Sequence, residues 1–225
     1  MDIFDLLFPK KCLSCSRVGS YLCSSCLAGL SAKRQTCPHC GRSSFRGKTH
    51  TGCIRKLDLD GHCYLWEYRG VVRKALLTMK YKFAFDIAAN LAQLASKRLE
   101  MEQPFPKKTL LLPIPTHPVR RNWRGFNQSE AVGKLLAQKM GWGYKPNLLV
   151  KKRTTVAQTE LKRQARLNNL QNVFSLNPEK HFPKKKFFLL FDDIWTTGST
   201  LKEACKVLKQ AGATKVCGLT LAKTN

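Results

Sequence analysis

Six cysteines near the start of the chain form three pairs of the type Cys-x-x-Cys: Cys12/Cys15, Cys23/Cys26 and Cys37/Cys40. Two thiolates at this spacing in one tight turn can bind the same tetrahedral Zn²⁺, with each sulfur about 2.3 Å from the metal. A disulfide framework is the alternative, but it is typical of secreted chains. The first residues here lack the basic start and long apolar stretch of a signal peptide. The pairs therefore predict structural zinc.

The cysteines divide into one complete ligand set and one incomplete set. The complete set, C-x2-C-x7-C-x2-C, consists of Cys12, Cys15, Cys23 and Cys26. The incomplete set consists of Cys37, Cys40 and Cys53. The candidates for its fourth ligand are Cys63, His50, His62 and His39. The spacing does not choose among them, and it leaves open both a weak or absent second site and crossed pairing of the two sets. An all-thiolate site leaves no position open for chemistry.

A second group of reactive side chains is the acid pair Asp192 and Asp193, which follows the apolar run Phe187–Phe191. The loop after it consists of Thr196, Thr197, Gly198, Ser199 and Thr200. Ligands of open α/β sheets bind outside the carboxyl ends of the strands. Two carboxylates there can accept hydrogen bonds from sugar hydroxyls, and N–H and hydroxyl groups at a helix N-terminus bind phosphate. The run predicts a site for ribose 5-phosphate.

An ordinary strand-to-helix turn is the alternative interpretation of this run, with Thr200 and Glu203 forming a capping box. Such a turn does not require two adjacent acids at the end of a strand. Adjacent carboxylates repel each other unless hydroxyls or cations satisfy them. Sugar-phosphate binding is therefore the preferred interpretation.

The chain is strongly basic, with 40 Lys and Arg against 14 Asp and Glu and a formal net charge of +26. More than half of the excess lies in residues 105–186, which favours a polyanionic partner; a solvated lysine-rich surface is the alternative. The candidate nucleic-acid-binding residues are Arg120, Arg121, Trp123, Arg124, Arg153, Arg163 and Arg166. Around Trp123 and Phe126, guanidinium groups beside aromatic rings suit single-stranded nucleic acid, because phosphates pair with Arg and bases stack on rings. The three later arginines, Arg153, Arg163 and Arg166, could bind pyrophosphate equally well. Packing of Trp123 and Phe126 at a helix entry is the alternative for the rings.

Alternating strands and helices must position these groups. Apolar runs predict strands over 64–68, 109–114, 148–150, 173–176, 187–191 and 215–221. Helical apolar spacing predicts helices over 71–81, 87–99, 127–141 and 200–210. Asn127 with Glu130 forms a cap at the start of the third helix, and Gly141 ends it. Strands that alternate with helices predict an α/β fold with a parallel sheet covered on both faces.

The cysteines and this alternation divide the chain into two domains. Residues 1–63 form a zinc-ribbon domain, single or double, and residues 64–225 form the α/β domain. About 60 residues rarely hold a core without such a metal. Cys205 and Cys217 stand alone in apolar surroundings and are expected to be buried. The longest apolar runs fall far short of the roughly 18 residues of a membrane span, so we expect a soluble, cytoplasmic protein.

The run around Asp192 resembles the 5-phosphoribosyl-1-pyrophosphate (PRPP) motif of type I phosphoribosyltransferases, and the chain from about Cys12 to Leu221 resembles the ComF family. Members combine a zinc ribbon with a phosphoribosyltransferase domain and are linked to DNA uptake in natural competence. Further matches are Pro113-Ile114-Pro115, Arg120-Arg121, Arg124-Gly125-Phe126-Asn127-Gln128, Arg153, Gln158, Leu161, Arg166 and Asn169-Leu170. Two positions depart from the family pattern: Ser199 replaces a frequent Ala, and Lys56 replaces a usual Cys.

The resemblance implies a type I phosphoribosyltransferase-like parallel sheet flanked by helices. Within it, Asp192 and Asp193 would be the catalytic residues that contact the ribose hydroxyls, and Thr196–Thr200 would bind the 5′-phosphate of PRPP. The resemblance also implies Mg²⁺ with PRPP where the domain is catalytic. The implied partners are single-stranded DNA, the DNA-uptake helicase ComFA and recombination proteins.

The predicted function is therefore that of a competence protein for DNA uptake, which binds single-stranded DNA in the cytoplasm and carries a PRPP-binding domain. One alternative is an active phosphoribosyltransferase acting on a base or amine. The sequence supports its sugar-phosphate half but shows no nucleobase pocket. The other alternative is a non-catalytic module whose zinc ribbon docks a partner protein.

Overall fold

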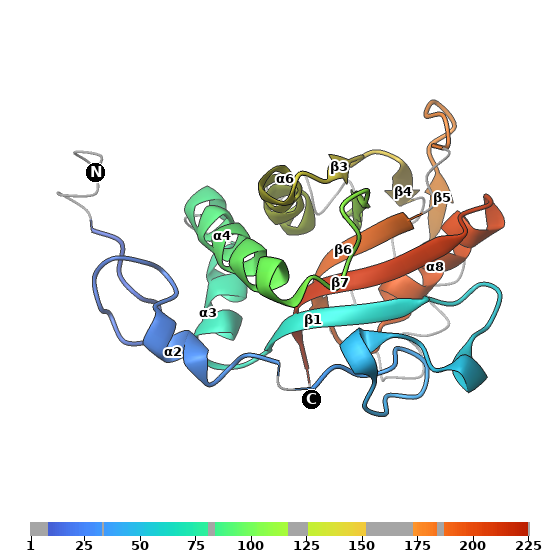
Figure 1. Ribbon diagram of the computed structural model, residues 1–225. Coiled ribbons are helices and arrows are strands. Elements are labelled where there is room, and N and C mark those ends of the chain that lie inside the picture. The colour runs from blue at the N-terminus through green and yellow to red at the C-terminus, as the bar shows by residue number, and fades with distance from the viewer. Residues whose placement is uncertain are drawn as a thin grey trace, which may run out of the picture.

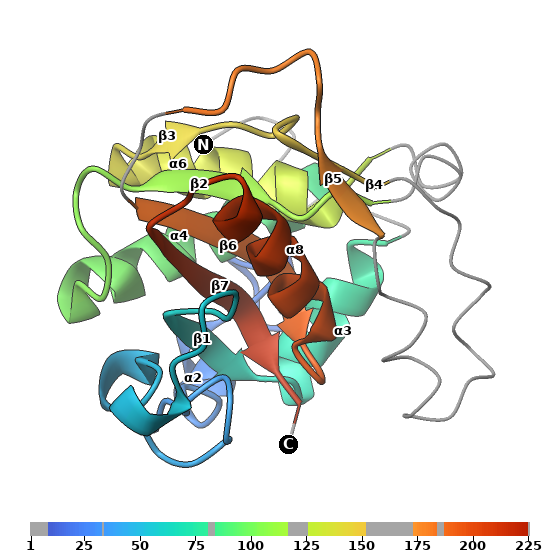
Figure 2. The same cartoon turned by 90° about the vertical axis from the view of Figure 1, so that its right-hand side faces the viewer.

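A five-stranded parallel sheet forms the centre of the computed structural model, which describes residues 9–32, 34–80, 84–116, 126–151, 173–183 and 187–224. The strand order is β1-β7-β6-β2-β3 (Figure 2). The strands are β1 (Gly61–Glu67), β2 (Leu110–Pro113), β3 (Gly143–Tyr144), β6 (Phe187–Trp195) and β7 (Lys215–Lys223). The predicted α/β fold class is confirmed.

The central strand β6 is buried on both faces, which is why its sequence is a continuous apolar run. Its side chains alternate between two cores: Leu189 and Phe191 join one, and Phe188 and Leu190 join the other. All four are 0% exposed. A slip of one residue would exchange the two faces. The two cores together therefore fix where β6 ends and where its acids lie.

In the part of the chain that the structure describes, three helices cover one face of the sheet and one helix covers the other (Figures 1 and 2). The first three are α3 (Gly70–Thr78), α4 (Ala84–Glu102) and α6 (Gln128–Met140), and the fourth is α8 (Ser199–Gln210). Among the described residues, no helix combines the length and apolar character needed to cross a membrane. Cys205 of α8 and Cys217 of β7 are buried, as predicted.

The predicted caps of α6 are confirmed. The Asn127 side chain accepts a hydrogen bond from the Ser129 N–H at 3.0 Å, which satisfies one of the free donors of the first turn. Gly141 ends the helix in the left-handed region with a φ of 64°. A second Asn127 contact, from its Nδ2 to the Ile114 carbonyl at 2.9 Å, fixes the start of α6 to the end of β2.

The sequence prediction missed the short strand β3, and it is wrong in two features of the strands that it did predict. Strand β6 continues to Trp195, because its last residues stay in register with β7, so the acid pair lies within the strand and not after it. Strands β4 (Leu149–Lys151) and β5 (Phe174–Leu176) pair antiparallel with each other in a separate two-stranded sheet. Both features depend on pairing between distant segments, which an apolar run does not reveal.

The cysteine-rich segment has little regular structure: its first part lies beside α3 and α4, and the residues from Leu30 onward pack along β1, the edge strand of the sheet (Figure 1). Its elements are α2 (Ser24–Ala28) and the 3₁₀ turns η1 (Phe45–Gly47) and η2 (Thr51–Cys53). Isolated bridges join Ser31 to Trp66 and Lys48 to Gly61. This cover protects the edge of β1 from pairing with another chain. Because β1 begins at Gly61, His62 and Cys63 lie in the sheet.

Candidate functional site

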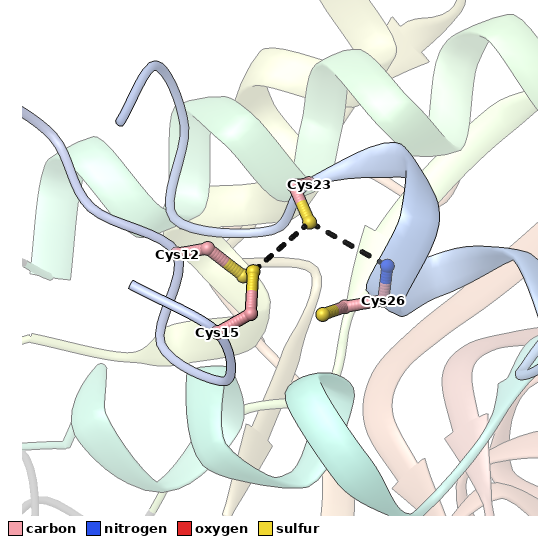
Figure 3. Close-up of side chains that lie close together, drawn as sticks. All are labelled: Cys12, Cys15, Cys23 and Cys26. Carbon is pink, nitrogen blue, oxygen red and sulfur yellow. Dashed lines mark hydrogen bonds between the residues drawn. The ribbon is translucent and has the colours of Figure 1, made fainter. Parts of the chain in front are cut away.

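The first cysteine cluster brings together four thiols from two turns: Cys12, Cys15, Cys23 and Cys26 (Figure 3). Their sulfur atoms all lie within 4.8 Å of one another. The sulfurs of Cys15 and Cys23 are 3.6 Å apart, close to the edge of about 3.8 Å that a tetrahedron of Zn–S bonds would have. The Cys26 N–H also points to the Cys23 sulfur at 3.5 Å. The set fits a structural Zn²⁺.

The second cluster consists of Cys37, Cys40, His50 and Cys53, with the ligand atoms again within 4.8 Å of one another. His50 is therefore the fourth member, three residues before Cys53, whereas the family pattern places a Cys three residues after it, at Lys56. The Nδ1 of His50 lies 3.4 Å from the Cys40 sulfur, and its Nε2–H donates to the Ser43 carbonyl at 3.0 Å. That outer hydrogen bond directs the Nδ1 lone pair to the thiols.

The other candidates for the fourth ligand are engaged elsewhere. The His39 ring contacts the Asp58 carboxylate at 3.0 Å. His62 is buried and hydrogen-bonded with the Thr220 hydroxyl at 3.0 Å. The Cys63 thiol is buried and donates to a backbone carbonyl at 3.1 Å. The two ligand sets are not crossed. Cys12 and Cys15 group with Cys23 and Cys26, whereas Cys37 and Cys40 group with His50 and Cys53.

The two clusters share one turn geometry. The N–H of the fifth residue of the turn donates to the carbonyl of the first cysteine at 2.9 Å in both, from Ser16 to Cys12 and from Gly41 to Cys37. Ser16 has a φ of 61° and Gly41 a φ of 75°. Burial raises the pKa of the Cys12 and Cys37 thiols, but backbone N–H groups outweigh it and lower both to about 6. Each turn is thus arranged to stabilise a thiolate, the form that binds metal.

The acid pair lies half-buried near the carboxyl end of β6, on the sheet edge that the sequence predicts. The Asp192 carboxylate accepts hydrogen bonds from the Ser129 hydroxyl and from the Asp193 N–H, both at 2.9 Å. Ser129 is in the first turn of α6, so this contact joins the helix to the strand. These two hydrogen bonds fix the orientation of the Asp192 carboxylate.

Electrostatics disfavour ionisation of both acids. Burial and the Asp193 charge raise the pKa of Asp192 to about 8, although the Ser129 hydroxyl opposes the shift. Burial also raises the pKa of Asp193, against the effect of the Lys80 charge. A carboxylate held in this way gains most from a hydroxyl or cation that replaces its lost water. The pair is therefore suited to a polyhydroxyl ligand or a ligand with a bound cation.

The loop from Thr196 to Thr200 turns tightly from β6 into α8. Gly198 has a φ of 75°, and a Cβ there would lie 2.1 Å from the Trp195 ring, so only glycine fits. The hydroxyls of Thr197 and Ser199 are 2.7 Å apart. Gly198 is the N-cap of α8 and supplies no side-chain cap, so the alternative capping box at Thr200 does not form among the described residues. The arrangement leaves a glycine turn at a helix N-terminus, as an anion site requires.

The Trp195 ring packs against this loop at Gly198. The His62 ring stacks on the Trp195 ring with centroids 3.9 Å apart, and Lys202 of α8 lies 6.0 Å from the same ring. Burial and the charges of Lys223 and Lys202 keep the pKa of His62 well below its ordinary value. The imidazole is therefore neutral and serves as a packing surface between β1 and the loop.

The structure describes some of the predicted site residues and not others. It brings together the seven predicted metal-site cysteines, and it brings Asp192 and Asp193 into one strand with Thr196–Thr200 in the loop that follows. It adds His50 and Ser129, which the sequence interpretation left unassigned or missed. Ser129 follows the recognised Asn127-Gln128 pair, which is the only signal that pointed to it. The nucleic-acid candidates Arg120, Arg121, Trp123, Arg124, Arg153, Arg163 and Arg166 lie outside the described residues.

Comparison with known proteins identifies residues 3–57 as a double zinc ribbon domain. The chain is 31% identical over 209 residues to the competence protein ComFC of Streptococcus pneumoniae, covering 88% of this chain and 85% of that protein. It is 27% identical over 208 residues to competence protein F of Haemophilus influenzae, covering 87% of each. It is 28% identical over 204 residues to the DNA utilization protein YhgH of Salmonella typhi, again covering 87% of each.

One similar solved structure is a glutamine phosphoribosylpyrophosphate amidotransferase from B. subtilis complexed with ADP and GMP. It is 16% identical and has a TM-score of 0.42. The match covers 65% of this chain and 30% of that chain.

Proposed function

This chain belongs to the ComF family, and from that membership we propose that it is a competence protein that binds single-stranded DNA during DNA uptake and holds a phosphoribosyl ligand at the end of β6. Its relatives are named competence proteins and DNA utilization proteins, which supports a role with DNA. Cytoplasmic action beside the helicase ComFA and recombination proteins is part of the same proposal.

The observation that carries the ligand part is the half-buried acid pair on β6 next to a glycine turn. Asp192 and Asp193 would accept hydrogen bonds from the two ribose hydroxyls of PRPP, and the residues Thr196–Thr200 would surround its 5′-phosphate. The raised pKa of both carboxyls supports this assignment, because burial has removed water that a sugar hydroxyl or a cation can replace. Mg²⁺ would accompany PRPP and balance the charge of its pyrophosphate.

Zinc has a different role in the proposal. Both clusters have four protein ligands, so a bound Zn²⁺ would have no open position for a substrate. The metals would hold the ribbon segment in the shape that covers β1. Zinc is therefore proposed as a structural component and not as a catalyst.

The support for DNA binding is the charge of the chain together with the names of its relatives. Residues 105–186 hold 18 basic and 3 acidic residues. Such an excess binds the phosphate backbone and makes affinity fall steeply with salt, because bound counterions are released. The Arg and Trp side chains of this stretch would supply phosphate contacts and base stacking.

An active phosphoribosyltransferase is the second candidate. The observation that favours it is the acid pair itself, since two carboxylates and the nearby charge of Lys80 could stabilise a ribosyl cation and its leaving pyrophosphate. In this reaction the bond between the ribose C1 and the pyrophosphate oxygen breaks as a bond from C1 to a base or amine forms. Fold and motif support ligand binding more directly than turnover.

Calorimetry with PRPP and Mg²⁺ tests the ligand part. We expect measurable binding by the intact chain and a loss of at least tenfold in affinity for the Asp192→Asn, Asp193→Asn double variant, since an amide, unlike a carboxyl group, cannot ionise when a cation or a sugar hydroxyl replaces its lost water. Asp86→Asn, which alters an exposed acid on α4, is the control and should bind normally. No heat of binding by the intact chain would contradict the proposal.

A salt series with labelled single-stranded DNA tests the other part. We expect the logarithm of the association constant to fall linearly with the logarithm of the salt concentration. The same titration with PRPP and Mg²⁺ present shows whether the two ligands are coupled. DNA binding that cannot be measured even at low salt would contradict the proposal.

A further inference from the structure

Phe45 presents an exposed ring from a turn that is itself fixed to the sheet. Its side chain is 74% exposed. Two residues on, a Cβ at Gly47 would lie 1.9 Å from the His62 carbonyl oxygen, so the turn lies directly on β1. The Cys63 thiol donates to the Arg46 carbonyl at 3.1 Å, and Lys48 forms a bridge with Gly61. The backbone that carries the ring is therefore rigid while the ring remains in water.

Two cations lie beside this ring. The guanidinium carbon of Arg46 is 5.4 Å from the Phe45 centroid, and the Lys48 ammonium nitrogen is 6.0 Å from it. Both distances are within the range of cation–π interaction. An exposed aromatic ring with adjacent cations is the composition of a stacking platform for single-stranded nucleic acid, where the base stacks and the phosphate pairs with a cation.

The surroundings of the ring are positively charged. Residues 34–56 contain six Lys and Arg and no Asp or Glu. The acids that follow are already engaged: Asp58 contacts His39 at 3.0 Å, and Asp60 contacts Lys209 at 2.7 Å. A phosphate group that approaches residues 34–60 therefore encounters cations. The carboxylates of Asp58 and Asp60 are paired with His39 and Lys209 and do not oppose it.

A cavity of about 510 Å³ opens beside Phe45. Arg34, Gln35, Ser43 and Ser44 are among its lining residues and offer hydrogen-bonding groups. Glu102, the one carboxylate among the described lining residues, is paired with Arg98 at 2.8 Å. The volume is within the range of small-ligand sites. A base stacked on the ring would thus have room and polar partners at its edge.

We propose that the segment of the second cysteine cluster carries a nucleic-acid contact in which a base stacks on Phe45 while Arg46 and Lys48 bind the flanking phosphates. The inference rests on the proposed DNA binding and gives it a second location, separate from residues 105–186. The turn is held in position by β1, so its backbone needs no rearrangement, and only the Arg46 and Lys48 side chains move from the ring to the phosphates when a base stacks.

The test is titration of a labelled oligothymidylate with the full chain and matched variants. Phe45→Ala is expected to weaken binding about 5- to 100-fold, the loss that removal of one stacked base produces. Phe45→Trp is expected to restore it, because the indole offers a stacking face. Val18→Ala alters an exposed apolar residue of the first ribbon that has no ring, and it should leave the affinity unchanged. All variants are compared at equal zinc content.

The cations are tested by the slope of the salt dependence. The double variant Arg46→Gln, Lys48→Gln should reduce the slope by about 1.4, since each phosphate contact to a single strand contributes about 0.7. Crosslinking with an iodouracil-substituted oligonucleotide, followed by mass spectrometry, should modify the peptide that contains Phe45 in the intact chain.

The outcomes separate this site from the proposed function. If the intact chain binds no oligonucleotide, DNA binding itself is wrong. If it binds, but Phe45→Ala binds equally well and no crosslink maps to its peptide, the stacking site is overturned while DNA binding stands elsewhere. The exposed ring would then be a contact for a protein partner instead.

Discussion

The cysteine clusters and the acid edge of β6 are built in opposite ways. In each cluster the ligands come from within 17 residues of one another and share one turn geometry, so the chain needs almost no long-range information to assemble them. The acid edge depends on a contact between Ser129 and Asp192, which are 63 residues apart, and on a sheet with two cores. Local spacing therefore supplies most of the ligands of a metal site, whereas a ligand site on a sheet requires the whole domain.

Removal of zinc should have the largest effect, and this effect should fall on the cysteine clusters. Structural zinc contributes about 10–16 kcal/mol in zinc-finger peptides, so a chelator should unfold the ribbon segment, uncover β1 and lower the melting temperature of the full chain. Metal analysis should give two zinc ions per chain before chelation. The Cys205→Ala variant, whose change lies in α8 and in neither cluster, should keep both. Protein purified without stoichiometric zinc would contradict the metal assignment.

His50→Ala should affect only the second cluster. Loss of one of four ligands should reduce the zinc content from two ions per chain to one, because the first cluster shares no ligand with the second. The control is His39→Ala, the neighbouring imidazole that contacts Asp58, which should retain two ions. An unchanged zinc content in His50→Ala would return the fourth-ligand position to the other candidates.

Gly198→Ala should break the second region through its backbone. The left-handed φ costs about 1–2 kcal/mol for a residue with a Cβ, and overlap with the Trp195 ring adds about 1–3 kcal/mol. Gly212 has a φ of 96° and open space where a Cβ would lie. Gly212→Ala should therefore lose only the stability that the left-handed φ costs. Urea unfolding of both variants measures the difference. Equal destabilisation would mean that the loop yields to the added methyl.

Asp192→Asn should change how stability depends on pH. The folded-state pKa of about 8 is above the ordinary value of 3.8, so the folded protein keeps a proton that the unfolded chain releases. Stability from that proton is complete below about pH 4 and is lost as pH rises through 8. The Asn variant should therefore be more stable than the wild type at pH 8.5, and the gap should close at pH 4. Urea unfolding at several pH values checks the sign, which the opposite trend would refute.

Ser129→Ala should have the smallest effect and should separate positioning from folding. Loss of the hydroxyl removes about 1 kcal/mol of interaction with the carboxylate, so PRPP affinity should fall up to tenfold and the pKa of Asp192 should rise further. Ser96→Ala is the control, since its hydroxyl donates to a carbonyl within α4. If both variants bind PRPP as the wild type does, Ser129 does not position the acid.

Much of the site could be predicted from the sequence because its signals are short-range. The turns of the Cys-x-x-Cys pairs, the cap formed by Asn127 and the glycine that ends α6 all lie within a few residues of the groups they serve. The role of His50 could not be predicted, because four side chains of the same part of the chain, His39, His50, His62 and Cys63, were available as the fourth ligand. The chain path around β1 occupies three of them and leaves His50 facing the thiols.

The order of residues along the chain is enough to predict what both regions contain: two sets of metal-binding cysteines, two adjacent acids and a glycine loop that follows a buried strand. Tertiary structure alone decided that Ser129 contacts Asp192, that β4 pairs with β5 and that the Phe45 turn lies on β1. The physical reason is the range of the interaction. Turns and caps form from neighbouring residues, whereas strand pairing and the approach of side chains from separate elements depend on how the whole chain buries its apolar surface.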